Sequence, residues 1–328
     1  MRPEYSLSEL RPELLYDLLA FGVFFLASAS VTDWKREWTA LAVGTFLLLV
    51  FQVLHEDFGL RMGRHPPDGG PGPFSTHLVL MAALLPALVW QAPWGFGRPS
   101  WTLALALVMI FGAAWTTGNR IVWIALIAAS IAAIAASARA STSDARDRRR
   151  LGIVFAIGAL AMTIAFVLSI GEKSERYYRQ DPTFTASLER DVRRPIWSLG
   201  LQKAHEAPWL GHGFGREILE PSFLPLRPHA LHPPVTHGHN AFLNVMLELG
   251  LAGLAIFIAL WFFLARHYWR MLTIPTVAPL GVIGLTLLTG FLVKNLTDDF
   301  FHRHNGLVFW ALNGMLLGLA SRNREAAA

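Results

Sequence analysis

The sequence contains no cysteine and few charged residues. Without cysteine the chain has no disulfide, no thiolate metal site and no cysteine nucleophile. Only 16% of its 328 residues are Asp, Glu, Lys or Arg, whereas a soluble domain typically has about a quarter. Hydrophobic residues make up 53% of the chain, and its mean hydropathy is +0.41. This balance excludes an ordinary soluble protein and favours a membrane protein.

The hydrophobic residues are gathered in long runs. A transmembrane helix needs about 20 mainly apolar residues, and only a helix satisfies its backbone polar groups within one such segment. The runs therefore predict an all-α polytopic membrane protein with about nine spanning helices. The runs lie at 14–31, 39–54, 77–90, 101–114, 121–135, 151–170, 249–264, 279–293 and 307–319.

The net charge of +5 is distributed in a way that argues against a nucleic-acid partner. The basic residues cluster in four separated connections, at 35–36, 146–150, 266–270 and 322–324. If the helices alternate in direction, all four connections lie on one side, and the positive-inside rule makes that side cytoplasmic. Counting back along the helices places the N-terminus and the long segment 171–239 on the opposite side.

We expect one membrane domain in three parts. Residues 1–170 supply the N-terminal helices, 171–239 form a large external loop with short helices, and 240–328 supply the C-terminal helices. The loop holds half of the 12 histidines and 8 of the 19 prolines. The chemistry of the protein is therefore expected outside the membrane, on the side of this loop.

The segment Thr236-His237-Gly238-His239-Asn240 leads directly into a predicted helix. His239, Leu243, Met246, Gly250 and Gly253 follow at steps of three or four, so they share one helical face, where the glycines would let a neighbouring helix approach closely. In the first helical turn, the dipole discourages a protonated imidazole. A neutral imidazole is what a general base requires. The other interpretation is an interfacial histidine above a glycine packing face.

Arginines mark two further places on the external side. Arg120 begins a predicted helix, where its guanidinium could clamp a phosphate through paired donors or could simply extend to the interface. Arg193 and Arg194 lie at the start of a second predicted helix, 194–207, shortly before Trp197. A glycine-rich turn at 208–215 follows this helix. These two arginines could form a second cationic clamp or an ordinary surface pair.

Together, these motifs resemble the O-antigen ligase and polymerase superfamily. The shared features are His239-Asn240 followed after nine positions by Gly250 and Gly253, an arginine at Arg120, and an Arg193…Trp197 segment before the Pro208–Gly215 turn. The segment 297–306 is similar to the ligase branch. The resemblance implies a GT-C-like glycosyltransferase in the bacterial inner membrane with a periplasmic active site.

The resemblance also implies a reaction and residue roles. The reaction is inverting, metal-independent transfer of a glycan from undecaprenyl diphosphate to lipid A-core, among membrane lipids and without a cofactor. The implied catalytic residues are His239, Arg120 and Arg193, and the four-residue spacing to Trp197 favours Arg193 over Arg194. The implied substrate-binding residues are Arg194, His237, Asn240 and Trp197, and the implied structural residues are Gly250, Gly253, Gly211 and Gly213.

Three alternatives remain open from the sequence. An O-antigen or other glycan polymerase of the same superfamily would use the same donor with a second lipid-linked glycan as acceptor. A membrane transporter could use intramembrane charges such as Lys294 and Asp298, although these lie four residues apart and could simply pair. A periplasmic zinc site could be built from histidines, namely His229, His232, His237 and His239.

Overall fold

The computed structural model describes residues 3–30, 44, 71–86, 101–141, 145–177, 193–223 and 235–325. Throughout these residues the regular structure is helical and contains no strand, which confirms the all-helical prediction. The helices are α1 (Pro3–Leu10), the π-helix η1 (Arg11–Leu15), α2 (Tyr16–Ser30), α4 (Pro71–Ala82), α6 (Trp101–Thr116), α7 (Arg120–Arg139), α8 (Ala145–Tyr177), α10 (Arg193–Glu206), α11 (Glu220–Phe223), α12 (Ala241–Met271), α13 (Ala278–Asn295) and α14 (Arg303–Glu325).

Within the described residues, five helical segments are long and apolar enough to cross a membrane. They are Pro3–Ser30, Arg120–Arg139, Gly152–Ser169, Ala241–Met271 and Ala278–Asn295. The chain is therefore a helical membrane protein. The other runs differ for separate reasons: α4 and α6 have only 12 and 16 residues, α14 is interrupted by polar residues, and 39–54 lies outside the described residues apart from Gly44.

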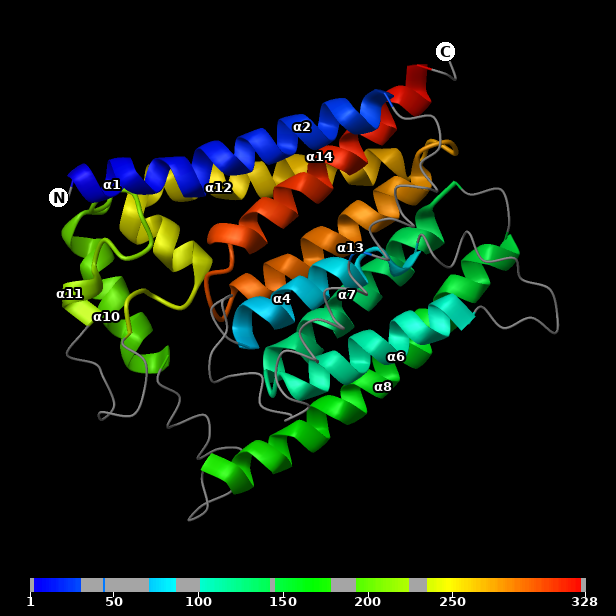
Figure 1. Ribbon diagram of the computed structural model, residues 1–328, viewed down its shortest axis with the longest axis horizontal. Helices are drawn as coiled ribbons and strands as arrows, with labels where there is room; N and C mark the ends of the chain where they lie inside the picture. Colours follow the sequence, from blue (N-terminus) through cyan, green and yellow to red (C-terminus); the bar gives the residue numbers. More distant parts are fainter. Residues whose placement is uncertain are drawn as a thin grey trace.

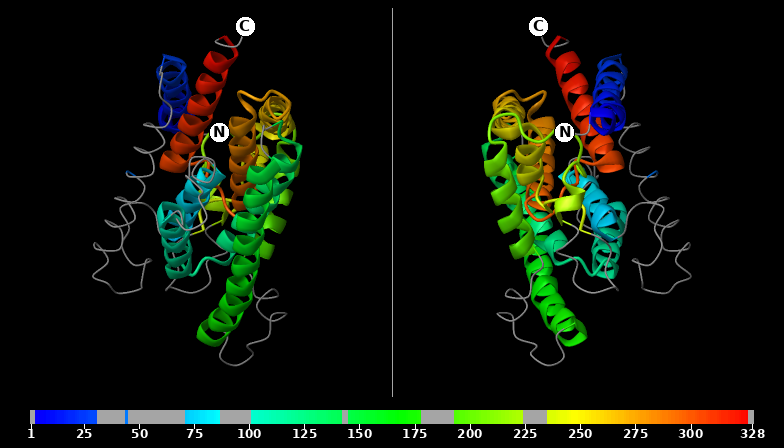
Figure 2. Two further views of the ribbon diagram at one scale, coloured as in Figure 1. Left: turned by 90° about the vertical axis from the view of Figure 1, so that its right-hand side faces the viewer. Right: turned by 90° about the vertical axis from the view of Figure 1, so that its left-hand side faces the viewer.

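The helices form an elongated bundle in which α13 contacts both α12 and α7, and α7 contacts α8. Figure 1 shows α2 and α14 along one edge and α8 along the other, and the side views of Figure 2 agree. The α2–α14 contact depends on two glycines. A Cβ at Gly314 or Gly318 would collide with the carbonyl oxygens of Phe21 and Phe25, respectively. Small residues at this four-residue spacing let two helix backbones approach closely in a membrane.

The two ends of the bundle differ in character. At one end, α10, α11 and the start of α1 lie together (Figure 1), and the phenolic oxygen of Tyr5 accepts a hydrogen bond from the backbone N–H of Glu217 over 3.0 Å. At the other end, Arg139 lies 4.9 Å above the Trp269 ring, and the Ser141 N–H donates to the Leu272 carbonyl over 2.7 Å. The basic connections of α7, α12 and α14 lie at this second end, which we call the basic end.

We use the name headpiece for residues 193–223 together with residues 235–249, which include the first part of α12. The headpiece has a core of its own, formed by Ile196, Ala204, Phe223, Val235, Leu243 and Leu247. It lies at the end of the bundle opposite the basic end (Figure 1). The headpiece and the basic end therefore lie at opposite ends of the bundle.

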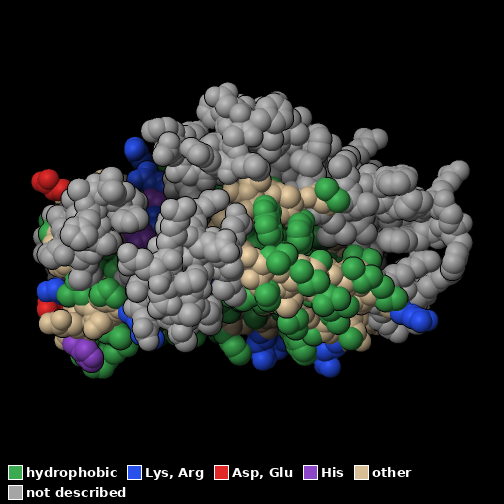
Figure 3. Space-filling model, turned by 90° about the horizontal axis from the view of Figure 1, so that it is seen from below, with side chains coloured by type: hydrophobic (Ala, Val, Ile, Leu, Met, Phe, Trp, Pro, Cys, Tyr) green, Lys and Arg blue, Asp and Glu red, His purple; other side chains and the backbone are tan. Residues whose placement is uncertain are grey.

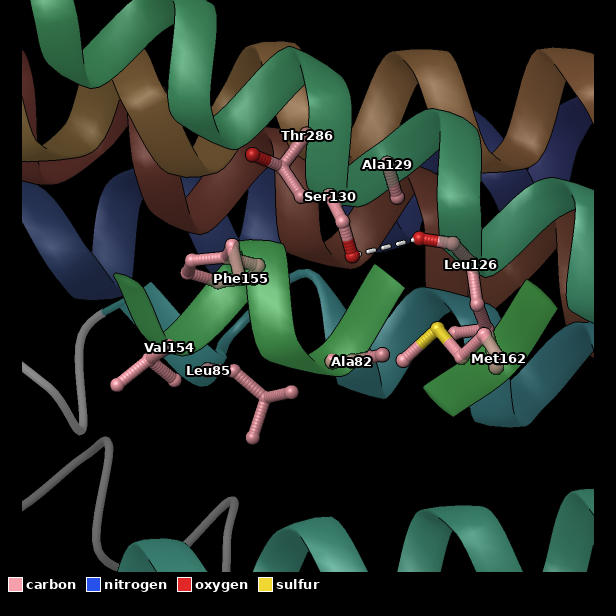
Figure 4. A pocket seen from close by; sticks show the side chains of 10 residues that line it. Ala82, Leu85, Leu126, Ala129, Ser130, Val154, Phe155, Met162 and Thr286 are labelled. Carbon is pink, nitrogen blue, oxygen red and sulfur yellow. Dashed lines mark hydrogen bonds between the residues drawn. The ribbon is translucent and has the colours of Figure 1, made fainter. Parts of the chain in front are cut away.

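The outer helices and the interior both have apolar surfaces. On α8, four apolar residues share one face and are each at least 49% exposed, namely Ile153, Ile157, Leu160 and Ile164. Figure 3, which views the molecule from below relative to Figure 1, shows hydrophobic side chains gathered on that side. A small cavity of about 20 Å³ lies between α4, α7, α8 and α13 (Figure 4). Its lining is almost wholly apolar, and it contains none of the predicted site residues.

Candidate active site

His239 lies on the turn before α12, rather than in the first helical turn as the sequence predicted. The helix begins at Ala241, and its N-cap is Asn240, whose Oδ1 accepts a hydrogen bond from the Leu243 N–H over 3.0 Å. The φ angle of His239 is +46°, in the left-handed region that residues other than glycine rarely adopt. Such backbone strain gathers at functional sites, where the surrounding structure must hold it in place.

Two side chains hold the His239 turn in place. The indole N–H of Trp197 in α10 donates to the His239 carbonyl over 3.4 Å. The side-chain amide of Asn240 donates to the Leu296 carbonyl over 2.9 Å. The turn is therefore attached both to α10 and to the loop 296–302 that joins α13 to α14.

Asp298 on this loop faces His239. Its Oδ1 lies 3.1 Å from Nδ1 of His239. An ionised carboxylate can only accept hydrogen bonds, so Nδ1 carries a proton, and in the neutral imidazole the lone pair is on Nε2. Within the described part of the chain, Nε2 of His239 has no hydrogen-bond partner, and the side chain is 27% exposed. This geometry leaves one nitrogen able to take a proton from an incoming group.

His237 differs from His239 in burial and in partners. Its Nε2 lies 3.0 Å from Asp298 Oδ1 and 2.6 Å from Nη2 of Arg216, and its Nδ1 lies 3.1 Å from the Thr236 hydroxyl. Nε2 of a neutral imidazole can donate to Asp298 or accept from Arg216, according to the tautomer, but it cannot do both. Burial lowers the pKa of His237 to about 4, so its imidazole is neutral at pH 7. His237 is suited to bracing Asp298 and Arg216 rather than to exchanging protons.

The ionisation of Asp298 depends on these same neighbours. Burial alone would raise the pKa of its carboxyl group, but the hydrogen bonds with His237 and His239 outweigh burial and hold that pKa well below its usual range. The Arg216 guanidinium lies 3.5 Å from Oδ1, and the Asp299 N–H donates to Oδ1 over 2.8 Å. Asp298 therefore stays ionised across the physiological range of pH.

A buried polar bridge joins the histidine turn to the Asp298 loop from beneath. The Oδ1 of Asn244 accepts from the Gly238 N–H over 2.8 Å, and its Nδ2 donates to Oδ2 of Asp299 over 2.7 Å. The second carboxylate oxygen of Asp299 accepts from the Phe301 N–H over 3.2 Å. Buried polar groups are costly unless they are hydrogen-bonded. These hydrogen bonds therefore fix the position of the histidine turn relative to the Asp298 loop.

The two adjacent arginines of α10 have different positions. Nε of Arg193 donates to the Thr297 carbonyl over 2.8 Å, one residue from Asp298, whereas Arg194 is exposed. The structure therefore brings Arg193 to the His239–Asp298 pair, together with Trp197, His237 and Asn240. Arg194 is not part of this cluster.

The contacts of the described residues do not bring Arg120 into this cluster, although a polar chain starts at its neighbour Asn119. Asn119 caps α7 through Oδ1, which accepts from the Ile121 N–H over 3.2 Å, and its Nδ2 donates to the Ser75 hydroxyl over 3.1 Å. The ammonium of the fully buried Lys294 donates to the same hydroxyl over 2.8 Å. A polar chain therefore links the start of α7 to the end of α13, close to the Asp298 loop.

The glycines have a different role from the one the sequence predicted. Gly250 has φ +66° and ψ −163°, so it interrupts α12, and no continuous helical face connects His239 to Gly253. Because Gly250 has no side chain, the 208–215 turn can pack against it, where the sequence predicted a neighbouring helix. A Cβ on Gly250 would collide with the backbone of Trp209 and Leu210. A Cβ on Gly211 would likewise collide with the backbone of Glu248 and Leu249.

The backbone groups released by this break are satisfied by the glycine-rich turn. His212 N–H and Gly213 N–H donate to the Leu247 and Glu248 carbonyls over 2.8 and 3.0 Å. In return, Leu251 N–H donates to the Pro208 carbonyl over 2.8 Å. The carboxylate of Glu248 also accepts from the Gly215 N–H over 2.9 Å. The 208–215 turn and the broken helix are thus one interlocked unit that carries Arg216 into the site.

The two histidines and Asp298 lie close enough together to be considered as ligands of a metal ion. The ligand atoms of His237, His239 and Asp298 lie within 4.8 Å of one another. Arg216, however, lies 2.6 Å from the His237 nitrogen that such an ion would need, and a guanidinium is always charged and only donates. The side chains present therefore do not fit a cation. The other histidines of the zinc interpretation lie outside the described residues, at His229 and His232.

The chain is similar in sequence to known proteins. A family model described as O-antigen ligase matches residues 104–258. An O-antigen ligase from Pseudomonas aeruginosa is 24% identical over 344 aligned positions, which cover 99% of this chain and 74% of that protein. These two matches support a place for the chain in the O-antigen ligase superfamily. A protein from Rickettsia prowazekii with a proposed assignment as a polysaccharide ligase is 34% identical over 91 positions, which cover 26% of this chain and 21% of that protein.

The match to O-antigen ligases covers most of the predicted site. Arg120, Arg193 and His239 all lie within the residues of the family model, and so do both glycines of the α12 pattern. Asp298 lies beyond that model but within the alignment to the Pseudomonas aeruginosa ligase, which covers nearly the whole chain. The two matches support a ligase- or polymerase-like role for the protein.

Sequence reasoning missed two residues of this ligase-like site. Asp298 was interpreted as a possible partner of Lys294, but its carboxylate contacts the histidines and Arg216, while Lys294 contacts Ser75 and lies 4.6 Å from the Phe300 ring. Arg216 was not singled out at all. The available signal was its position directly after Gly215, the last glycine of the turn.

Proposed function

We propose that this protein is an inverting, metal-independent glycosyltransferase. It transfers an O-antigen glycan from undecaprenyl diphosphate to lipid A-core, in the assembly of lipopolysaccharide. The observation that carries the proposal is the His239–Asp298 pair, in which Nδ1 faces a carboxylate and Nε2 is left without a partner among the described residues. Arg193 beside this pair adds positive charge where a diphosphate would depart.

The reaction is a single displacement. The acceptor hydroxyl gives its proton to Nε2 of His239 as its oxygen bonds to the anomeric carbon of the donor sugar. The bond between that carbon and the diphosphate oxygen breaks, and the diphosphate leaves with the bonding electrons. Arg193 and Arg120 neutralise the charge that develops on it. Attack opposite to the leaving group inverts the anomeric configuration.

Asp298 positions the base in this scheme. Its carboxylate holds Nδ1–H of His239, which fixes the tautomer and directs Nε2 toward the acceptor, and its charge stabilises the imidazolium that forms. Because the low pKa of Asp298 keeps it ionised, this orientation persists under mildly acid conditions. His237 and Arg216 hold Asp298 from the other side. Trp197 and Asn240 hold the turn, and Arg194 lies at the exposed entrance as a further contact for substrate.

The proposed setting is the bacterial inner membrane, with a GT-C-like arrangement and the headpiece in the periplasm. The count of about nine spans requires α4, α6, α14 and the segment 39–54 to cross as well. The division into 1–170, 171–239 and 240–328 remains our description of the chain. Single cysteines in this Cys-free chain test the orientation: an impermeant thiol reagent applied to intact spheroplasts should label Gln202→Cys and spare Ser141→Cys. Labelling of Ser141→Cys alone would reverse the assignment.

The function itself is tested by the products that accumulate in cells. Deleting the gene should remove lipopolysaccharide capped with O-antigen while lipid-linked polymer is still made. Purified protein should then transfer glycan from a lipid-linked donor to lipid A-core. Transfer to a second lipid-linked glycan in place of lipid A-core would assign the polymerase reaction instead. An unchanged lipopolysaccharide profile in the deletion strain would refute both.

A further inference from the structure

Two large apolar side chains project from the headpiece beside the break in α12. Trp209 is 71% exposed and Leu210 is 75% exposed. They are neighbours at the tip of the 208–215 turn, whose backbone is hydrogen-bonded to α12 on both sides of Gly250. Tryptophan and leucine at an exposed tip are unfavourable in water. Their position relative to the membrane therefore needs an explanation.

The surroundings of α12 locate the edge of the membrane. Between Ala241 and Glu248 none of its residues is exposed, because the headpiece covers them. From Leu249 onward, exposed apolar side chains recur as far as Trp269, a length of about 30 Å at 1.5 Å per residue. A bilayer has a hydrocarbon core of about 30 Å. The outer edge of this apolar band therefore falls at Leu249, next to the break.

The 208–215 turn lies at this same level. Its carbonyls at Pro208 and Trp209 accept hydrogen bonds from the N–H groups of Leu251 and Ala252 over 2.8 and 3.3 Å, which are the first residues of the exposed apolar band. Trp269, with Arg139 above its ring, marks the other edge. Tryptophan is enriched at both interfaces of a membrane, where its apolar ring and polar N–H meet different surroundings. Trp209 and Trp269 thus stand at the two ends of one membrane thickness.

The residues preceding the tip remain polar. Lys203 and Glu206 near the end of α10 form an ion pair of 2.9 Å, with side chains 25% and 48% exposed. The polarity of the chain therefore changes within a few residues, from a charged helix surface to an apolar tip. An amphipathic boundary of this kind suits a segment that rests on a bilayer and inserts only its end.

We propose that Trp209 and Leu210 form a lipid wedge, inserted into the outer edge of the bilayer beside the break in α12. The wedge sets the height of the headpiece above the membrane, because the turn is fixed to α12 and leads directly back into α10. It thereby sets the height of Arg193 and Trp197. If the proposed function holds, this height matches those residues to the diphosphate of a lipid-linked donor, which lies at the headgroup level.

Depth measurements test the wedge without any substrate. In the Cys-free full-length chain, Leu210→Cys carries a bimane label and is reconstituted in vesicles of phosphatidylethanolamine and phosphatidylglycerol. Nitroxide at the lipid headgroup should quench this label more strongly than nitroxide at the middle of the acyl chain. Ile258→Cys, within the exposed band of α12, should show the opposite order. Gln202→Cys on exposed α10 should be quenched by aqueous iodide only.

Two results would overturn the wedge. Quenching of the Leu210→Cys label by iodide but by neither lipid would place the tip in water. Protection from all three quenchers would mean that protein covers it, such as a second copy of the chain. Either result leaves the proposed glycan transfer untouched, since that activity is measured separately.

A matched pair of variants tests the consequence for activity. Leu210→Asp should lower the rate of transfer from lipid-linked donor in vesicles severalfold, whereas Leu201→Asp, at a 52% exposed position on α10, should leave it near that of the unaltered protein. Equal losses in both variants, or none in Leu210→Asp, would show that the wedge does not set the height of the site. Absence of any glycan transfer by the unaltered protein would instead contradict the proposed function.

Discussion

The two parts of α12 on either side of Gly250 have opposite surroundings. Before Gly250 the helix is enclosed by the headpiece, and its buried polar residues, Asn244 and Glu248, are hydrogen-bonded to turns that carry the site. After Gly250 the helix has apolar residues facing outward, including Ile256 and Phe263 at 71% and 64% exposure. One helix thus serves a polar site and a lipid-facing span.

The difference explains why the candidate active site lies beside the part of α12 before Gly250. Buried carboxyl groups and amides are tolerated only when each is hydrogen-bonded. The headpiece supplies partners at Gly215 and Gly238, and the 296–302 loop supplies Asp299. The membrane part has no need of them, since its helices bond internally. The break at Gly250 separates the part of α12 whose buried polar side chains need hydrogen-bond partners from the part that faces lipid.

Replacing the glycine at this point should have the largest effect. The φ and ψ of Gly250 lie in a region that is essentially restricted to glycine, and a Cβ would also meet the backbone of Trp209 and Leu210. Gly250→Ala should therefore destabilise the headpiece by about 3 kcal/mol or more, seen as a lower melting temperature and protease-sensitive α10. Gly152→Ala in α8, where a Cβ has open space, is the control and should be neutral or stabilising. Equal stability of the two variants would remove the break as a structural requirement.

Replacing Asp298 should separate chemistry from folding within the headpiece. Asp298→Asn keeps the size of the side chain but can stabilise the wrong tautomer of His239, so turnover should fall roughly 10²-fold. Binding of the lipid-linked donor should change little. Glu220→Gln, a carboxylate in α11 outside the cluster, serves as the control. Turnover by Asp298→Asn within twofold or threefold of the unaltered protein would show that the His239 tautomer does not depend on this carboxylate.

The paired arginines provide a sharper comparison within one helix. Loss of a hydrogen bond to a charged group costs about 1.5–3 kcal/mol, so Arg193→Ala should lower kcat/KM roughly tenfold to a hundredfold. Arg193→Lys should not rescue it, because an ammonium does not replace a planar guanidinium. Arg194→Ala should be milder, since Arg194 is exposed and outside the cluster. The reverse ranking would reassign the clamp to Arg194.

The smallest predicted effect is a dependence of stability on pH. The pKa of His237 falls from 6.5 in the unfolded chain to about 4 in the folded one, so below pH 6.5 the unfolded state binds more protons. Stability should therefore decline as pH falls from 6.5 toward 4, by about 1.4 kcal/mol at about pH 5.5. Thermal unfolding across this range measures the decline, and His237→Asn should flatten it. An equally steep decline in that variant would assign the effect to other groups.

Much of this arrangement could be predicted from the sequence. The apolar runs indicated the helices, and the spacing around 194–207 and 208–215 indicated α10 and the glycine turn. The resemblance brought Arg193, Trp197 and His239 together, and the structure places them in one cluster. These features depend on local pattern, which a sequence expresses directly.

The remaining features depend on contacts between distant segments. Gly250 and Gly253 fit a helical face equally well whether the helix continues or breaks, and the outcome is decided by the 208–215 turn, which supplies the missing hydrogen bonds. Asp298 contacts histidines that lie about sixty positions earlier in the chain. Its spacing from Lys294 suggested a local pair, but Ser75, on a helix far away in sequence, takes the lysine instead.

The role of His239 as the general base is tested most directly by measuring glycan transfer and donor binding with purified His239→Asn. Asparagine tolerates the left-handed backbone that His239 adopts, so the variant removes the imidazole without adding backbone strain. A positioned base contributes about 10²–10⁴-fold, so turnover should fall by that factor while donor binding is retained, with a metal chelator present throughout. Turnover within a few-fold of the unaltered protein would contradict the role of His239 as the base, and loss of activity on adding chelator to the unaltered protein would contradict the metal-free site.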